Sequence, residues 1–80
     1  MIEVEVRLYA TLHRYSPQAG VGEPLTLQMP EGARLADLLA RLGVPKGEVK
    51  TVFVNNRQQD EGYLLRDGDR VALFPPVAGG

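Results

Sequence analysis

The sequence contains no cysteine, and this absence excludes several kinds of chemistry at once. Without thiols, the chain forms no disulfides, has no thiol nucleophile and offers no cysteine ligand to a metal. The single histidine, His13, has no second histidine or cysteine to complete a metal site, so we interpret it as a surface residue. We therefore predict no metal site and a fold stabilised by packing alone.

Long apolar runs and clusters of one charge are also missing. No segment approaches the ~20 apolar residues of a membrane span, and residues 1–8 alternate charged with apolar side chains, unlike a secretory signal. The nine Lys and Arg residues are scattered and the net charge is −1, so the basic surface typical of nucleic-acid or lipid binding is absent. We expect a soluble cytoplasmic protein that binds neither nucleic acid nor a membrane.

The glycines and acidic residues form no recognised site for a nucleotide or a cation. No glycine belongs to a G-x-G-x-x-G or P-loop pattern. Asp67 and Asp69 flank Gly68, but the spacing of a calcium loop is missing, and we interpret the three residues as a turn. We therefore expect no bound cofactor. A domain of this size buries only ~60% of its unfolded surface, so function should lie on the surface or at a terminus.

Alternating apolar residues predict several strands. Residues 2–9 alternate strictly, with Ile2, Val4, Val6 and Leu8 on one face. Residues 25–29 form a second alternating run, and the turn-rich segment between the two runs predicts a hairpin. Residues 51–54 and 70–74 have the composition of two further strands, and 57–65 is interpreted as holding a short edge strand.

One helix is predicted over residues 33–42, after a single helical turn at 10–15. Its leucines fall at the i, i+3, i+4 and i+7 positions of one face, Leu35, Leu38, Leu39 and Leu42. Gly43 and Pro45 predict its end, and Asp37 lies favourably near its positive end. The order of elements predicts an α+β fold, in which the helix packs on one face of a mixed sheet of four to five strands.

The end of the chain departs from the pattern of a packed domain. Pro75 and Pro76 remove two backbone donors, and no charged side chain follows them. Prolines favour extended backbone at ~3.1 Å per residue, so 75–80 reaches roughly 19 Å. Gly79 and Gly80 lack a β-carbon and would pass a constriction that other residues cannot. We divide the chain into a domain, 1–74, and an extended tail, 75–80; composition alone leaves a frayed terminus open.

Five segments of the sequence together resemble the MoaD/ThiS family of ubiquitin-like sulfur carriers, which have the β-grasp fold. The segments span the whole chain and read LYATL, PEGARLADLLARLG, VFVNN, LLRDGDRVALFPP and VAGG. The most specific block, DGDRVALFPPVAGG, is more similar to the end of molybdopterin synthase small subunits than to that of thiamine-pathway carriers. The resemblance implies a β-grasp fold and a function at the carboxylate of Gly80.

The resemblance also implies the partners and the chemistry. An E1-like adenylyltransferase of the MoeB/ThiF type would consume ATP to adenylate Gly80, and a sulfur donor enzyme would then supply the sulfur of a thiocarboxylate. The large subunit of molybdopterin synthase, in a heterotetramer, would receive the tail and use the sulfur to build molybdopterin. Catalysis would lie in these partners, so no residue of this chain is predicted to be catalytic.

Several residues are assigned to partner contact by the same resemblance. Tyr9 and Phe74 match aromatic positions that meet partner enzymes in the family; Tyr9 has the outward parity of an exposed residue, whereas Phe74 is equally consistent with the core. His13 stands where family members commonly carry arginine. Gly79 is expected to give the tail access to an active site. The implied docking strip comprises Phe74, Pro75, Pro76, Val77 and Ala78.

Three alternatives keep the same fold. The acceptor of the sulfur could belong to the synthesis of a tungsten cofactor, a thiolated tRNA base or thiamine. The chain could instead be a ubiquitin-like modifier, with Gly80 joined to lysines of target proteins. From another class, it could be a binding module whose tail adds non-covalently as a strand to a partner.

Overall fold

The computed structural model describes residues 1–16, 20 and 22–76 of the chain, with the side chain of Lys46 excepted. It contains five strands, one α-helix and two short 3₁₀ helices. In chain order these are β1 (Ile2–Leu8), η1 (Ala10–Tyr15), β2 (Pro24–Met29), α1 (Leu35–Leu42), η2 (Lys46–Glu48), β3 (Thr51–Val54), β4 (Arg57–Gln59) and β5 (Arg70–Phe74). No helix among these residues is long and apolar enough to cross a bilayer.

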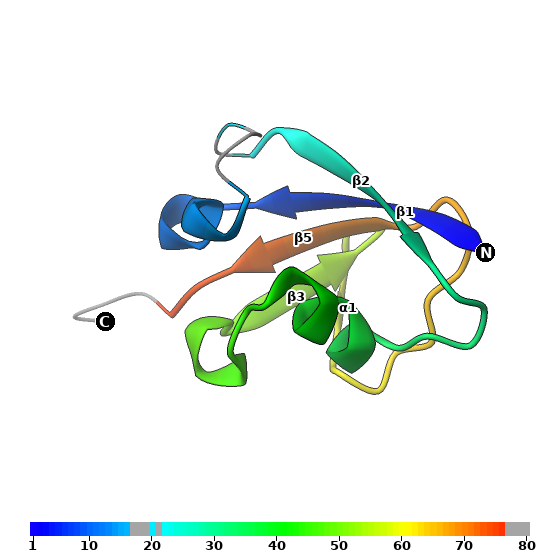
Figure 1. The fold of residues 1–80 in the computed structure, drawn as a ribbon. Helices are drawn as coiled ribbons and strands as arrows, with labels where there is room; N and C mark the ends of the chain where they lie inside the picture. The colour runs from blue at the N-terminus through cyan, green and yellow to red at the C-terminus, as the bar shows by residue number, and fades with distance from the viewer. Residues whose placement is uncertain (17–19, 21, 77–80) are drawn as a thin grey trace.

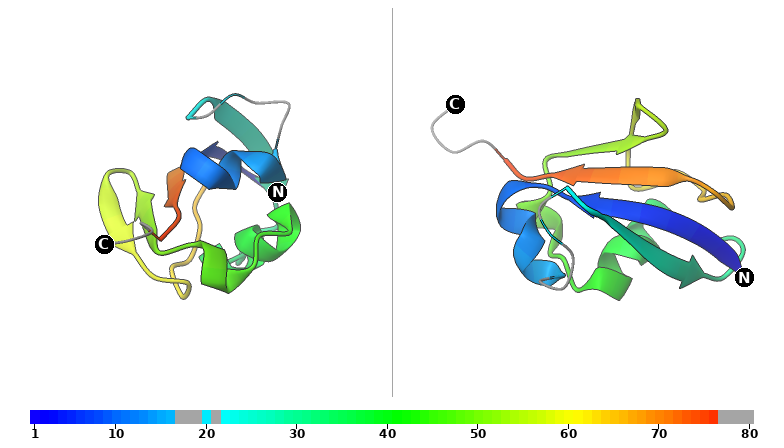
Figure 2. Two further views of the ribbon diagram at one scale, coloured as in Figure 1. Left: turned by 90° about the vertical axis from the view of Figure 1, so that its left-hand side faces the viewer. Right: turned by 90° about the horizontal axis from the view of Figure 1, so that it is seen from above.

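The strands form one mixed sheet in the order β2-β1-β5-β3-β4. The first and last strands, β1 and β5, lie side by side in parallel at its centre, whereas the other neighbouring pairs are antiparallel (Figure 1). Figure 2 shows α1 and η1 on the same side of this sheet. The predicted α+β architecture, a β-grasp fold with a mixed sheet and one main helix, is therefore confirmed.

The core lies between the sheet and α1. The inward residues of β1 are all buried, as their alternation predicts, and so are Leu35, Leu38 and Leu39 of the helix. Leu42 differs from the prediction because it is only half-buried, at the last position of α1. Burial of each large aliphatic side chain contributes about 1.5–3 kcal/mol to folding, so this layer is the main source of stability.

The helix begins at Leu35, two residues later than predicted. Arg34 is still extended, and its N–H donates to Oδ2 of Asp37 at 2.8 Å. The next two N–H groups, of Leu35 and Ala36, donate to carbonyls of the 60–65 segment instead of forming helical bonds. The N–H groups that lack a partner at the N-terminus of a helix are therefore bound here by a loop distant in sequence. The sequence pattern does not reveal this contact. Gly43 ends the helix with φ of 75°, as predicted.

The edge strand predicted within 57–65 is shorter than that range. β4 covers Arg57–Gln59 at the edge of the sheet, and the apolar residues that follow contribute only an isolated bridge between Leu64 and Arg34. Leu65 instead enters the core, where it is buried. The apolar end of this segment therefore serves as loop packing rather than as strand.

Candidate functional site

The face of the sheet opposite α1 carries the outward side chains of β1, β5 and β3, and we call it the open face. Pairing places Ala72 between Arg7 on one side and Phe53 on the other. Toward the start of β5, Arg70 pairs with Glu5 of β1. Toward the end of β5, Phe74 pairs with Thr51 of β3. The open face therefore has a charged end, Glu5, Arg7, Asn55 and Arg70, and an aromatic end next to the last residue of β5.

Three rings form the aromatic end, and we call them the aromatic cluster. Tyr9 stacks on Phe74 with ring centroids 4.6 Å apart and planes at 6°, and Phe53 meets Phe74 edge-on at 5.8 Å and 88°. All three residues are half-buried. A sheet face that no other element covers is usually polar, whereas aromatic residues are enriched where proteins bind one another.

The structure places Tyr9 and Phe74 together, although they are far apart in sequence. β1 ends at Leu8, one residue before the predicted end, and Tyr9 continues in extended conformation, its N–H donating to the carbonyl of Leu73 at 3.2 Å. Phe74 lies on the open face and not in the core, which removes the second interpretation of this residue. Their binding of partners stays a prediction.

Phe53 is a member of the cluster that the sequence analysis did not single out. The signal was present, because Val52 and Val54 on either side of it are buried and alternation makes Phe53 face outward. Its proximity to Phe74 depends on the antiparallel pairing of β3 with β5, which a single sequence does not specify.

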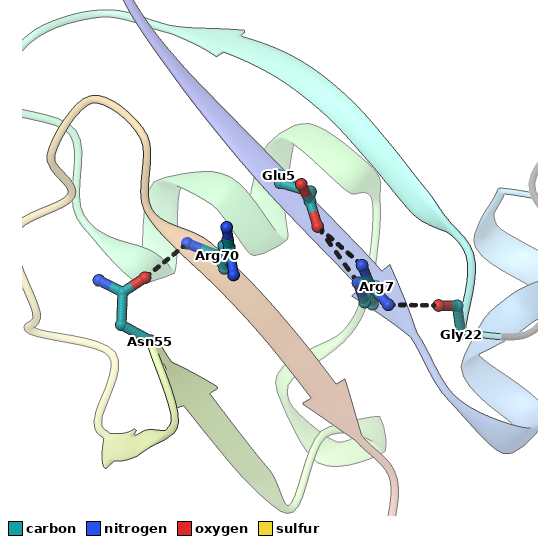
Figure 3. Close-up of polar contacts among 5 residues, drawn as sticks. All are labelled: Glu5, Arg7, Gly22, Asn55 and Arg70. Carbon is teal, nitrogen blue, oxygen red and sulfur yellow. Dashed lines mark hydrogen bonds and ion pairs between the residues drawn. The ribbon is translucent and has the colours of Figure 1, made fainter.

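At the charged end, each nitrogen of the Arg7 guanidinium has a partner (Figure 3). Its Nε and Nη2 donate to the same Glu5 oxygen at 3.2 and 3.1 Å, and Nη1 donates to the carbonyl of Gly22 at 3.4 Å. The hydrogen bond to Glu5 raises the pKa of the Arg7 guanidinium above its ordinary value, against a smaller opposing effect of burial. Arg7 and Glu5 therefore neutralise each other at physiological pH.

Arg70 is the other cation of this end, and it is exposed. Its backbone N–H donates to Oδ1 of Asn55 at 3.0 Å (Figure 3). Within the described part of the chain, its guanidinium has neither a hydrogen bond nor an ion pair. The charge of Arg70 is thus available to a ligand.

A buried carboxylate supports the charged end from beneath. Asp69 is 4% exposed and accepts hydrogen bonds from the Tyr63 hydroxyl at 3.0 Å, the Asn55 side-chain amide at 2.9 Å and the Arg66 backbone N–H at 2.9 Å. Burial raises the pKa of the Tyr63 hydroxyl above its ordinary value, and the bond to Asp69 raises it further. These bonds hold Asn55, and with it the start of β5, in one position.

The predicted turn at 67–69 is confirmed, and it also explains the Asp69 site. Gly68 has φ of 85°, a conformation that favours glycine, and Asp67 accepts the N–H of Glu3 through Oδ1 at 2.8 Å. Both aspartates thus have structural partners. The described residues contain no group of three His, Cys, Asp or Glu side chains placed to hold a metal.

A depression of about 410 Å³ lies between the charged end and the aromatic cluster. Its lining includes Arg7, Tyr9, Phe53, Arg70 and Ala72. The hollow exists because Ala72 is small and lies between two large side chains, Arg7 and Phe53. Such a surface can accept a side chain of another protein, with apolar contact at one end and charge at the other.

The root of the tail adjoins the aromatic cluster. The carbonyl of Phe74 accepts the N–H of Lys50 at 2.9 Å, and Pro75 and Pro76 then offer no donor to continue the ladder. Pro75 is half-buried and Pro76 exposed. The remaining predicted residues, Val77, Ala78, Gly79 and Gly80, lie outside the described residues, so their roles stay predictions.

The two 3₁₀ helices lie near the end of β5 that leads to the tail (Figure 1). Tyr15 of η1 donates its hydroxyl to Glu48 of η2, and Arg14 forms an ion pair with the same carboxylate. His13 lies on η1 and is half-buried. These interactions tie the two short helices together.

Residues 6–80 match the model of the ThiS family. A molybdopterin synthase sulfur carrier subunit from Chlamydomonas reinhardtii is 38% identical over 71 residues, covering 78% of this chain and 83% of that protein. A chain in the complex of subunits 1 and 2 of molybdopterin-converting factor from Helicobacter pylori 26695 is 27% identical with a TM-score of 0.63, covering 99% and 100%. Small archaeal modifier protein 1 from Methanosarcina acetivorans is 25% identical with a TM-score of 0.66, covering 100% and 98%. These findings confirm the resemblance that the motifs predict.

Proposed function

Because the chain belongs to the ThiS family, we propose that it is a sulfur carrier for molybdopterin synthesis, with the carboxylate of Gly80 as its working group. The observation that carries this proposal is the 38% identity to a molybdopterin synthase sulfur carrier subunit. The run from Arg70 through the paired prolines to Gly-Gly supports the same function, because it joins a central strand to an end that carries no charged side chain and finishes in two glycines.

The proposed chemistry uses the only reactive group that such a tail offers. A terminal carboxylate has a pKa of about 3.5, so it is ionised at neutral pH and can attack the α-phosphate of ATP, releasing pyrophosphate. A hydrosulfide equivalent then attacks the acyl carbon of the adenylate and expels AMP, which leaves a thiocarboxylate. An E1-like enzyme would bind ATP and catalyse the first step, and a sulfur donor enzyme would supply the second. We place this cycle in the cytoplasm, where ATP is available.

The domain itself would present and direct the tail. Tyr9 and Phe53 pack against the ring of Phe74, the residue immediately before Pro75, and so hold the end of β5 from which the tail begins. We propose that the aromatic cluster, Pro75 and Pro76 contact the large subunit of molybdopterin synthase while the tail enters its active site. The complex of subunits 1 and 2 from Helicobacter pylori supports a partner of this kind.

A ubiquitin-like modifier is the second candidate, and the likeness to small archaeal modifier protein 1 favours it. Both functions begin with the adenylate of Gly80. They diverge at the acceptor, which is a sulfur nucleophile for the carrier and the amine of a target lysine for the modifier. Covalent conjugates of the chain in a cell lysate would therefore distinguish the two.

The test is the intact mass of the protein purified from its own cells, with fragmentation to locate any exchange of one oxygen for sulfur. We expect the exchange at Gly80 in the native chain and its loss in Gly79→Val. Gly47→Val is the matched control, because a β-carbon at Gly47 meets nothing within 4 Å. Full molybdoenzyme activity in cells whose only copy lacks Gly80 would contradict the proposal.

A further inference from the structure

We propose that the depression over Ala72 binds one acidic side chain of the protein that receives the tail, and that the Arg70 guanidinium pairs with its carboxylate. This inference rests on the proposed function, because it assumes a tail-binding partner. It concerns the charged end of the open face, which neither the chemistry at Gly80 nor the aromatic cluster explains.

The hydrogen bonds of the charged end leave one group free. Glu5 stands opposite Arg70 in the register, but two nitrogens of Arg7 already bind its Oε1 (Figure 3). The Asn55 amide is neutral and is held in place at both ends, by Asp69 and by the Arg70 backbone N–H. In the described chain, Arg70 therefore adds an uncompensated positive charge to an otherwise neutral end.

The chemistry of this free group specifies the ligand. A guanidinium only donates hydrogen bonds and matches the two oxygens of a carboxylate, so the complementary group is an anion with planar acceptors. A single exposed cation binds a free anion weakly, because water screens the interaction. The carboxylate must therefore be attached to something that is held at this surface by other contacts.

The depression provides those contacts. Arg70 lies at one end, Tyr9 and Phe53 contribute rings to the lining, and small Ala72 leaves room between them. An aspartate or glutamate on a partner surface can place its carboxylate at Arg70 while apolar neighbours pack against the rings. Partial desolvation of the charge pair by these neighbours would strengthen it beyond an ordinary surface pair.

The connection to the tail favours the partner that holds the tail. Arg70, Ala72 and Phe74 are outward residues of one strand, β5, which leads directly into Pro75. A protein that binds the tail is therefore kept close to the depression, and the second contact becomes effectively intramolecular. Arg70 would then set the register between the open face and the partner.

The test is the dissociation constant of the full chain for the purified large subunit of molybdopterin synthase, measured by calorimetry at two salt concentrations. We expect Arg70→Glu to weaken binding about tenfold and Arg70→Gln about threefold, because the first variant repels the carboxylate and the second only loses the attraction. Ala72→Leu fills the depression and should also weaken binding about tenfold. Native affinity should fall more steeply with salt than that of Arg70→Gln.

Arg41→Glu is the matched control, because it makes the same charge reversal on α1, on the other side of the sheet. Its affinity should stay within about twofold of the native chain. Circular dichroism of each variant verifies folding. If Ala72→Leu disturbs the sheet, the exposed substitution Arg70→Gln still tests the inference. An Asp or Glu to Arg change in the large subunit that restores binding to Arg70→Glu would identify the paired carboxylate.

Native affinity in both Arg70 variants would overturn the inference. So would dimerisation of the chain that Arg70→Glu abolishes while binding of the large subunit is unchanged, because the depression would then receive a second copy. The intact mass of the chain, localised to Gly80, is an independent readout. If Gly80 carries a thiocarboxylate but binding does not depend on Arg70, only this inference is overturned. If binding depends on Arg70 but no thiocarboxylate forms, this inference is supported and the proposed function is contradicted.

Discussion

The two faces of the sheet are built from the same strands and have opposite properties. In β1, Val4 and Val6 are buried beneath α1, whereas Glu5 and Arg7 pair with each other on the open face. In β5, Leu73 is fully buried, and its neighbour Phe74 is half-buried in the aromatic cluster. Alternation lets one short strand serve stability on one side and recognition on the other, so a substitution should affect mainly one of the two.

The largest expected effect is on the helix-covered face. Leu38→Ala should lower the free energy of unfolding by about 2–5 kcal/mol, because Leu38 is fully buried and the small domain cannot collapse around the cavity. Leu64→Ala is the matched control, since Leu64 is 45% exposed and should cost under about 1 kcal/mol. Equal costs in urea denaturation would show that the buried face does not dominate stability.

The hydrogen bonds to buried Asp69, which support the open face, should also contribute to the free energy of unfolding. Tyr63→Phe removes the hydroxyl that donates to buried Asp69 and should cost about 1–2 kcal/mol at neutral pH. Because the folded state raises the pKa of Tyr63 above 10.0, its contribution is complete below pH 10 and is lost as pH rises through the folded-state value. The stability difference between the native chain and Tyr63→Phe should therefore shrink above pH 10. A difference that grows there would contradict this assignment.

The smallest effect should come from the stacked pair on the open face. A double-mutant cycle of Tyr9→Ala and Phe74→Ala should give a coupling of about 0.5–1.5 kcal/mol in unfolding, because the rings are stacked. The cycle of Tyr9 with Phe53 is the comparison, since each ring contacts Phe74 and no ring contact joins Tyr9 to Phe53 among the described residues. Equal couplings in the two cycles would mean that the cluster acts as one unit rather than through the stack.

Local sequence patterns were sufficient to predict most helices and strands, but not the residues at which they begin and end. The period of the leucines predicted α1, and Gly43 marked its end, because each signal depends only on neighbours in sequence. The start of the helix was missed because its first N–H groups bond to carbonyls of the 60–65 segment. Tyr9 and Phe74 were assigned through the family resemblance, while Phe53 was overlooked although its parity pointed outward.

The sequence by itself determined the strands, the helix, the turn at Gly68, the family and the chemistry expected at Gly80, because these depend on local conformation and on motifs. Only the tertiary structure decided which outward residues meet. The stack of Tyr9 on Phe74 follows from the parallel pairing of β1 with β5, and Arg70 keeps a free charge because Arg7 binds the Glu5 carboxylate that this pairing places opposite it. Pairing between strands some sixty residues apart depends on how the whole core packs, and no local pattern encodes it.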